Sequence, residues 1–353
     1  MIILIGRLKW LKEQLKSIGL EGMIVSNPSN IKYITGLDAE GVFLIASKEN
    51  VFITDSRYIE EVTNTITLEQ EIVAMNQKEL DSYDYEQFFT RDSQVGFEED
   101  YISYAKYQDY MQKYKVNLVE TEGLIEKLRA VKDEEEIANI KKACKITDDA
   151  FKYILTYIVP GVTEKEVAFE LQRYMIEQGA DGLAFDLIVA SGANSSKPHA
   201  VPTDKKIEDG DIVLIDMGAK YHGYCSDMTR TIFVGSCNFK KEYNYILEKQ
   251  KSIVNQFKDG TNIKPVIKQI EEDYLQNNYD VMHAFGHNLG IDIHEDPVLR
   301  SKLDQHLKTN MVIAVEPGIY LAGQYGIRIE DTYLVTSNGC EQLTKSDKSI
   351  VII

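Results

Sequence analysis

Two pairs of carboxylates lie in segments that otherwise have the composition of buried strands. If the hairpin is centred between Tyr221 and His222, Asp216 faces Asp227 on the returning strand. Glu316 and Glu330 have the same relation in a second hairpin nearer the C-terminus. Like charges directly opposite in an antiparallel pair are destabilising, and burying them is costly unless they are protonated or bind cations. The spacing therefore predicts a cation-binding site.

The alternative interpretation is an acidic hairpin face exposed to solvent. It suits either pair alone, because Asp and Glu are mostly surface residues. It suits the two pairs together poorly, since their sequence neighbours are Ile215, Met217, Val315 and Ile329. We therefore expect all four carboxylates to be metal ligands.

A histidine-rich segment offers the remaining ligand. His283, His287 and His294 fall within twelve residues of one another. We expect His287 to be the ligand, because Gly286 and Gly290 allow the backbone to approach closely. Four carboxylates and one imidazole form a hard, oxygen-rich donor set, which favours Mn²⁺ first, and otherwise Co²⁺, Fe²⁺ or Zn²⁺. We expect two divalent ions roughly 3.5 to 4 Å apart, a separation typical of two-metal hydrolytic sites.

The composition excludes several classes of partner. A formal net charge of −17 and a pI near 4.9 disfavour binding to nucleic acid or to anionic lipid. The apolar run at residues 1–5 is too short to span a membrane. The four cysteines form no C-x-x-C pair, so neither a zinc knuckle nor a disulfide framework is indicated. These features predict a cytoplasmic protein.

The order of the expected elements indicates two domains. Residues 1–125 alternate helical and strand patterns and form an α/β domain. Residues 126–353 contain two helix pairs, each followed by a hairpin, and helix-start signatures occur at Asp133 and Thr163, each with a glutamate three residues later. Two copies of one unit predict an α+β domain with pseudo-two-fold symmetry and the site between the copies.

Together with several motifs, these residues resemble the pita-bread (creatinase/methionine aminopeptidase-like) metallopeptidases, in the branch of Xaa-Pro aminopeptidase and Xaa-Pro dipeptidase. The motifs include Tyr-Ile-Thr-Gly at 33–36, Pro-His at 198–199, His-Glu at 294–295 and Val-Glu-Pro-Gly-Ile-Tyr at 315–320. The resemblance covers nearly the whole chain. It implies a creatinase-like N-terminal domain and a pita-bread catalytic domain that binds metal.

The resemblance also implies roles for residues beyond the metal ligands. His199 and His294 match histidines that contact substrate and stabilise the tetrahedral intermediate, and Glu316 matches a metal-bound carboxylate that moves protons. We also expect Arg328 and His283 to contact substrate. Arg328 shares a strand face with the ligand two residues later, so it either binds a substrate carboxylate or neutralises the acidic ligands.

Two positions depart from the family pattern. Asn288 stands where relatives commonly have glycine. Val298 stands where prolidase-like relatives usually have an arginine that holds the proline carboxylate, and Arg300 is the alternative cation. This departure favours aminopeptidase activity slightly over dipeptidase activity.

The reaction that we expect is hydrolysis of the N-terminal Xaa-Pro bond of short peptides. By resemblance, the enzyme is a homodimer in which the N-terminal domain of one subunit restricts the site of the other. Two other functions compete: a general or methionine-type aminopeptidase, and a non-catalytic pita-bread binding protein. The presence of all five ligand residues argues against the second.

Overall fold

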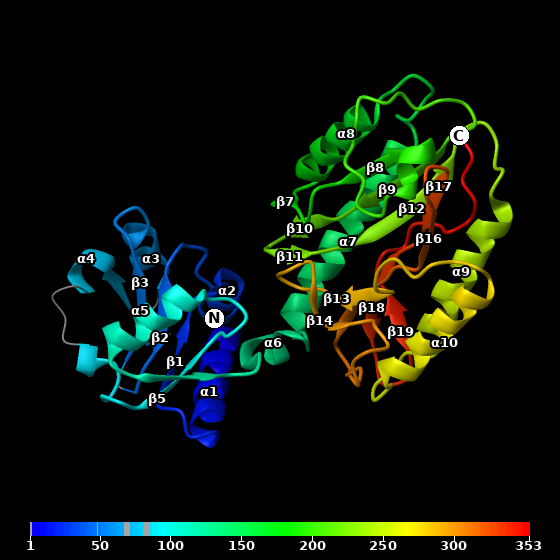
Figure 1. The fold of residues 1–353 in the computed structure, drawn as a ribbon. Coiled ribbons are helices and arrows are strands. Elements are labelled where there is room, and N and C mark those ends of the chain that lie inside the picture. The colour runs from blue at the N-terminus through cyan, green and yellow to red at the C-terminus, as the bar shows by residue number, and fades with distance from the viewer. Residues whose placement is uncertain (1, 48, 67–70, 81–84) are drawn as a thin grey trace. The chain divides into compact units, whose positions relative to one another are not determined.

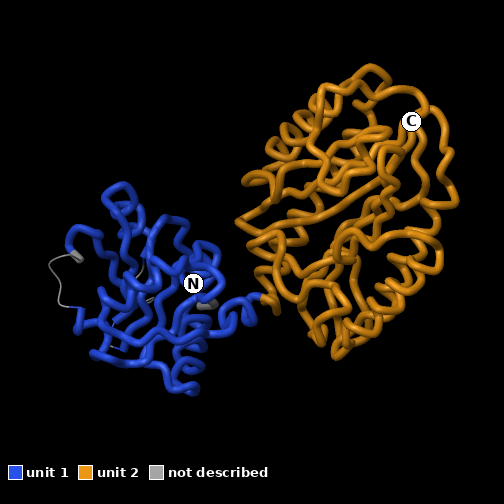
Figure 2. Tube along the Cα trace, viewed as in Figure 1, with its two compact units in different colours: residues 1–129 blue, residues 130–353 orange. Residues whose placement is uncertain are grey.

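The computed structural model describes residues 2–47, 49–66, 71–80 and 85–353. The chain divides into two compact units, residues 1–129 and residues 130–353, which are coloured separately in Figure 2. No helix among these described residues has the length and apolar content to cross a membrane.

The first unit is built on one mixed sheet of six strands, in the order β4-β3-β2-β1-β5-β6. The strands are β1 (Gly22–Val25), β2 (Val42–Ile45), β3 (Asn50–Thr54), β4 (Ile72–Asn76), β5 (Gln94–Phe97) and β6 (Asn117–Glu120). The helices are α1 (Ile2–Ser17), α2 (Pro28–Thr35), α3 (Ile59–Thr65), α4 (Gln77–Leu80), α5 (Tyr104–Tyr114) and α6 (Leu124–Arg129), with a short 3₁₀ turn, η2 (Tyr85–Gln87). Strands rich in Val, Ile and Phe are buried against the helices and form the core of this unit.

The second unit contains two helix pairs, each followed by strands. The first half comprises α7 (Glu134–Ile154), α8 (Glu164–Glu177), β7 (Gly182–Leu183), β8 (Ile188–Ser191), η3 (Gly192–Ser196), β9 (Ile212–Met217), β10 (Ala219–Tyr221), β11 (Tyr224–Cys225) and β12 (Met228–Phe233). The second half comprises α9 (Lys240–Val254), α10 (Ile263–Gln276), β13 (Gly286–Asn288), β14 (Glu295–Val298), β15 (Val312–Val315), β16 (Gly318–Leu321), β17 (Tyr325–Arg328), β18 (Asp331–Val335) and β19 (Cys340–Gln342).

The two halves repeat one topology, which confirms the predicted pseudo-two-fold fold. Strands are ordered β12-β9-β8 in the first half and β18-β15-β13 within the five-stranded sheet of the second. The start of the second helix of each pair is tied to a later loop by an equivalent bridge, Thr163 to Lys206 and Asn262 to His306. In Figure 1, α8 and the α9–α10 pair lie on opposite sides of the strands. Each helix pair covers its own half of the apolar core.

Local sequence signals set the helix starts of the first half. Asp133 and Glu136 form a reciprocal capping box at the start of α7, as predicted. Thr163 and Glu166 form another at the start of α8. Such a box satisfies amide groups that would otherwise lack partners, so these boundaries follow from short-range sequence alone.

The register of the first hairpin differs from the predicted one. Asp216 pairs with Thr229, and Asp227 therefore lies diagonally across the hairpin instead of directly opposite Asp216. The cause is a two-residue turn, His222-Gly223, in which both residues have positive φ, of 47° and 81°. This pattern suits the twist of a two-residue hairpin. A non-glycine residue at positive φ is uncommon, and the predicted hairpin was centred one residue earlier, between Tyr221 and His222.

The register of the second hairpin is the predicted one. The pairs Val315–Asp331 and Gly318–Arg328 keep one register on both sides of the ligand positions. Glu316 and Glu330 therefore stand at opposed positions between these two ladders.

Candidate metal centre and substrate pocket

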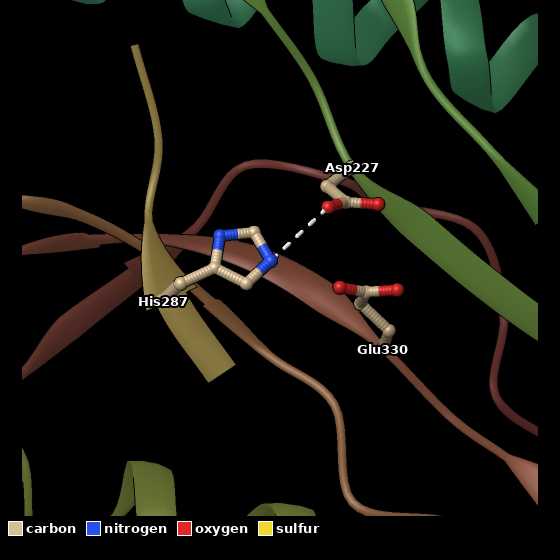
Figure 3. A group of neighbouring side chains, drawn as sticks. All are labelled: Asp227, His287 and Glu330. Carbon is tan, nitrogen blue, oxygen red and sulfur yellow. Dashed lines mark ion pairs between the residues drawn. The ribbon is translucent and has the colours of Figure 1, made fainter. Parts of the chain in front are cut away.

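Three buried side chains converge at the centre of the second unit. Asp227, His287 and Glu330 each offer a ligand atom, and these atoms lie within 4.8 Å of one another. Figure 3 shows the His287 ring facing both carboxylates, with a dashed line for its ion pair with Asp227. Its Nε2 lies 3.5 Å from Asp227 Oδ2. The residues come from three separate places: Asp227 directly precedes β12, His287 lies in β13 and Glu330 directly precedes β18. Only the packed second unit brings them together.

Two further carboxylates border this cluster. Glu316 Oε1 lies 3.7 Å from His287 Nε2, and the Glu316 side chain is 17 % exposed, so it is accessible from the pocket. Asp216 places Oδ2 2.6 Å from Arg328 Nη2. Its other oxygen, Oδ1, is buried without a hydrogen-bond partner among the described residues. An unsatisfied buried carboxylate oxygen is costly, and a bound cation would satisfy it.

The electrostatics of the cluster also fit a cation. Burial, and then the charges of Glu330 and Asp216, raise the pKa of Asp227 well above its usual value. Burial, followed by the charges of Glu316 and Asp216, does the same to the pKa of Glu330. Burial raises the pKa of Glu316 to about 8. Carboxylates held this close repel one another when ionised, so divalent ions fit this donor set.

His287 is prepared to bind metal in its neutral form. Burial lowers its pKa to about 4, so the ring is neutral at physiological pH and has a lone pair to offer. Nδ1 lies 3.1 Å from the carbonyl oxygen of Asn288. A hydrogen bond from Nδ1 to that carbonyl leaves Nε2 as the ligand atom.

Arg328 contacts the acidic cluster directly. Its Nη2 bonds Asp216, Nη1 donates to the Tyr320 hydroxyl, and Nε donates to Thr229 Oγ1 at 3.0 Å. The guanidinium is 3 % exposed. Most of its donors are thus engaged by protein groups, which favours neutralisation of the ligands over binding of a substrate carboxylate.

Two residues at the site were missed by the sequence reasoning. Thr229 donates its hydroxyl to Glu330 Oε2 at 2.6 Å, and it stands directly opposite Asp216 in the first hairpin. The Tyr320 hydroxyl lies between Arg328 and His283, 2.8 Å from His283 Nε2. Tyr320 stands opposite Gly326 and is a diagonal neighbour of Arg328 in the hairpin. Because diagonal neighbours are within reach of long side chains, the hairpin register could have predicted this contact.

A cavity of about 950 Å³ opens above the carboxylates. Its wall includes the three expected histidines, His199, His283 and His294. The His294 ring packs edge-on against His287, with centroids 4.4 Å apart, whereas His199 is exposed on the loop after η3. Burial, and then the nearby charge of Arg328, lower the pKa of His283 to about 4. The structure therefore brings all the expected site residues to one cavity.

The Glu164 carboxylate forms hydrogen bonds with residues on both sides of the loop that carries His199. This carboxylate is fully buried. It accepts hydrogen bonds from the backbone and side chains of Ser191 and Thr203, and from the side chain of Asn194. Glu164 begins α8, so a helix start in the first half fixes one wall of the cavity.

The repeated fold, with carboxylates and a histidine meeting between its halves, defines a metal-dependent hydrolase of the pita-bread type. Comparison with known proteins agrees with this class. Residues 138–337 match the model of metallopeptidase family M24, and residues 7–131 match the creatinase/prolidase N-terminal domain. The chain belongs to metallopeptidase family M24, and the predicted resemblance is confirmed.

The similar proteins include both Xaa-Pro dipeptidases and an X-Pro aminopeptidase. The structure of an Xaa-Pro dipeptidase from Bacillus anthracis is 38 % identical, with a TM-score of 0.91, over 99 % of this chain and 100 % of its own. The structure of an X-Pro aminopeptidase from Thermotoga maritima is 30 % identical, with a TM-score of 0.90, over 98 % and 99 %. An Xaa-Pro dipeptidase from Pyrococcus furiosus is 35 % identical in sequence, over 98 % and 99 %.

Proposed function

We propose that this protein hydrolyses the N-terminal Xaa-Pro bond of short peptides, using two divalent metal ions. The observation that carries the proposal is the meeting of Asp227, His287 and Glu330 at the floor of a cavity whose wall holds three further histidines. The Xaa-Pro specificity is supported by the names of the relatives. The proposed ligand set is Asp216, Asp227, His287, Glu316 and Glu330.

Each side chain of this site has a separate role in the proposed reaction. Two bound ions would supply an activated water and polarise the scissile carbonyl. His294 donates a hydrogen bond to the oxygen that becomes negative in the transition state, and His199 holds the peptide from the opposite loop. Glu316, which lies 3.7 Å from His287 and is reachable from the cavity, takes a proton from the attacking water and passes it to the proline nitrogen as it leaves. That nitrogen has no N–H of its own, so the departing group needs this proton.

A peptide panel tests the requirement for proline. We expect Ala-Pro-Ala to be cleaved between the first two residues when Mn²⁺ is supplied, whereas Ala-Ala-Ala is not, because the cavity is proposed to recognise the fixed φ of proline. Mass spectrometry of the products gives the position of the cut. Equal cleavage of both peptides would indicate a general aminopeptidase. Binding of Ala-Pro-Ala without turnover would indicate a non-catalytic protein.

We propose aminopeptidase activity on Xaa-Pro-Xaa peptides slightly ahead of dipeptidase activity. The cavity volume lies at the upper end of the roughly 300 to 1,000 Å³ usual for small-ligand sites, which leaves room beyond a dipeptide. Val298 and Arg300 both line the cavity. Arg300 makes no ion pair within the described part of the chain, so its guanidinium is the group that supports residual dipeptide binding.

We further propose a homodimer that works in the cytoplasm with Mn²⁺ as its metal. The four cysteines form no C-x-x-C pair in the sequence, which suits a reducing compartment. The dimer proposal rests on the creatinase-type N-terminal domain. Light scattering coupled to gel filtration should give twice the chain mass, and removal of residues 1–125 should give a monomer that accepts longer peptides. A full-length monomer with unchanged length selection would contradict this proposal.

A further inference from the structure

One lysine of the second unit is completely buried beside the metal centre. The Lys132 side chain is 0 % exposed, although lysine is almost never fully buried without a partner. Its ammonium lies 3.0 Å from Glu295 Oε2, whose side chain is 7 % exposed, and donates to Asn288 Oδ1 at 2.8 Å. It also donates to the carbonyl oxygen of Ala130 at 3.4 Å, so Glu295 and Asn288 are its two shortest side-chain contacts.

Both acceptors are sequence neighbours of site histidines. Asn288 directly follows His287, and Glu295 directly follows His294. The two acceptors pair with each other across β13 and β14, next to a register shift between His287 and Asn288. The Lys132 ammonium therefore links the two ends of the segment that runs from His287 to Glu295. The two rings are in contact, with centroids 4.4 Å apart.

Asn288 joins this pair to the surrounding strands. Its amide nitrogen donates to the carbonyl oxygens of Ala130 and Asp296, at 3.1 and 2.7 Å. Its oxygen also accepts from the backbone N–H of Leu289 at 3.1 Å. A glycine at this position would make none of these contacts. In this chain, the asparagine links strand β13 to the segment that contains the buried lysine.

A buried ion pair is weak evidence for a role in stability. Replacement of such a pair by apolar groups is often neutral, whereas removal of one partner leaves a costly unpaired charge. The geometry of Lys132 has a second consequence, because hydrogen bonds behind a metal ligand fix its orientation and basicity. The two roles can be separated by experiment.

We propose that Lys132 is a positioning residue that holds the imidazoles of His287 and His294 in place through Asn288 and Glu295. This inference deepens the proposed function, since it names what orients the metal ligand and the oxyanion donor. The lysine itself does not line the cavity and does not touch substrate.

The test compares Lys132→Met with the double variant Lys132→Met/Glu295→Gln. Methionine has nearly the shape of lysine, and glutamine removes the unpaired charge while it keeps an oxygen for the Asp292 N–H, which lies 3.3 Å from Glu295 Oε1. We expect the melting temperature to fall in the single variant and to recover in the double variant. In both, calorimetric titration with Mn²⁺ alone should show metal binding weakened by about 10- to 100-fold, as for loss of an outer-shell partner. The kcat value should fall more than KM changes.

The control is Lys145→Met, which removes an exposed lysine paired with Asp149 on α7. It should match the wild type in metal affinity and kcat. Wild-type Mn²⁺ affinity in the double variant would overturn the proposal and leave Lys132 a purely structural residue. If the single variant does not fold, the double variant still decides. Because Mn²⁺ titration needs no peptide, failure to cleave Xaa-Pro peptides would refute the proposed function without affecting this result.

Discussion

Asp227→Asn is expected to abolish peptide hydrolysis while the protein remains folded. The amide cannot supply the anionic oxygen that a divalent ion requires here, and Asp227 belongs to the most tightly convergent group of ligand atoms. The loss of kcat/KM should exceed the roughly 10- to 100-fold that mutation of an outer-shell residue costs. Metal analysis should show fewer than two ions per chain. His287→Ala should have the same effect.

The matched control is Asp204→Asn. The Asp204 side chain is 85 % exposed and pairs with Lys165, whereas the proposed ligands are buried. It should leave metal content and activity unchanged. Full activity of the wild type after exhaustive chelation would refute the metal mechanism itself.

Asp227→Asn should also stabilise the metal-free protein at neutral pH. Burial and neighbouring carboxylates raise the pKa of Asp227 above its unfolded value, so the folded state binds the proton more tightly. The stability from this group is full below the unfolded pKa and is lost as pH rises through the folded pKa. Metal-free wild type should therefore melt at a lower temperature at pH 7 than Asp227→Asn does, and saturating Mn²⁺ should reverse the order. Scanning calorimetry checks both results.

Val298→Arg is expected to shift substrate preference toward dipeptides. An arginine at this position in the cavity wall can offer charge-assisted hydrogen bonds to the free carboxylate of Xaa-Pro, which contribute roughly 1.5 to 3 kcal/mol. On the transition-state scale this is about a 10- to 150-fold gain in kcat/KM for Ala-Pro relative to Ala-Pro-Ala. The wild type should cleave Ala-Pro-Ala at least as well as Ala-Pro.

Arg300→Leu tests the other cation of the same wall. If Arg300 supplies the residual affinity for a dipeptide carboxylate, its removal should lower kcat/KM for Ala-Pro more than for Ala-Pro-Ala. The control is Lys302→Leu, because Lys302 is exposed and does not line the cavity. A wild type that strongly prefers Ala-Pro, with a ratio that neither variant changes, would contradict this account and direct attention to Arg328.

The hairpins show how far local sequence can predict register. The second hairpin could be aligned from its apolar pattern, and Glu316 and Glu330 stand opposed as expected. The first could not, because its two-residue turn places His222 at positive φ. A change of one residue in the centre of a turn moves the paired residue by two positions. Thr229 therefore takes the place that had been expected for Asp227.

The sequence by itself determined the chemical type of the site and the local boundaries. Buried carboxylates in apolar strands and a histidine between glycines indicate a hard metal centre in any fold that buries them. Likewise, capping boxes such as that of Asp133 and Glu136 depend on residues three apart.

Only the tertiary structure decided which groups meet. Arg328 bonds Asp216 across 112 residues, and Lys132 bonds Glu295 across 163. Neither contact leaves a periodic signal in the sequence, because each depends on how segments far apart in the chain pack together. The requirement that buried charges be paired tells us that partners exist, but the packing of the core selects them.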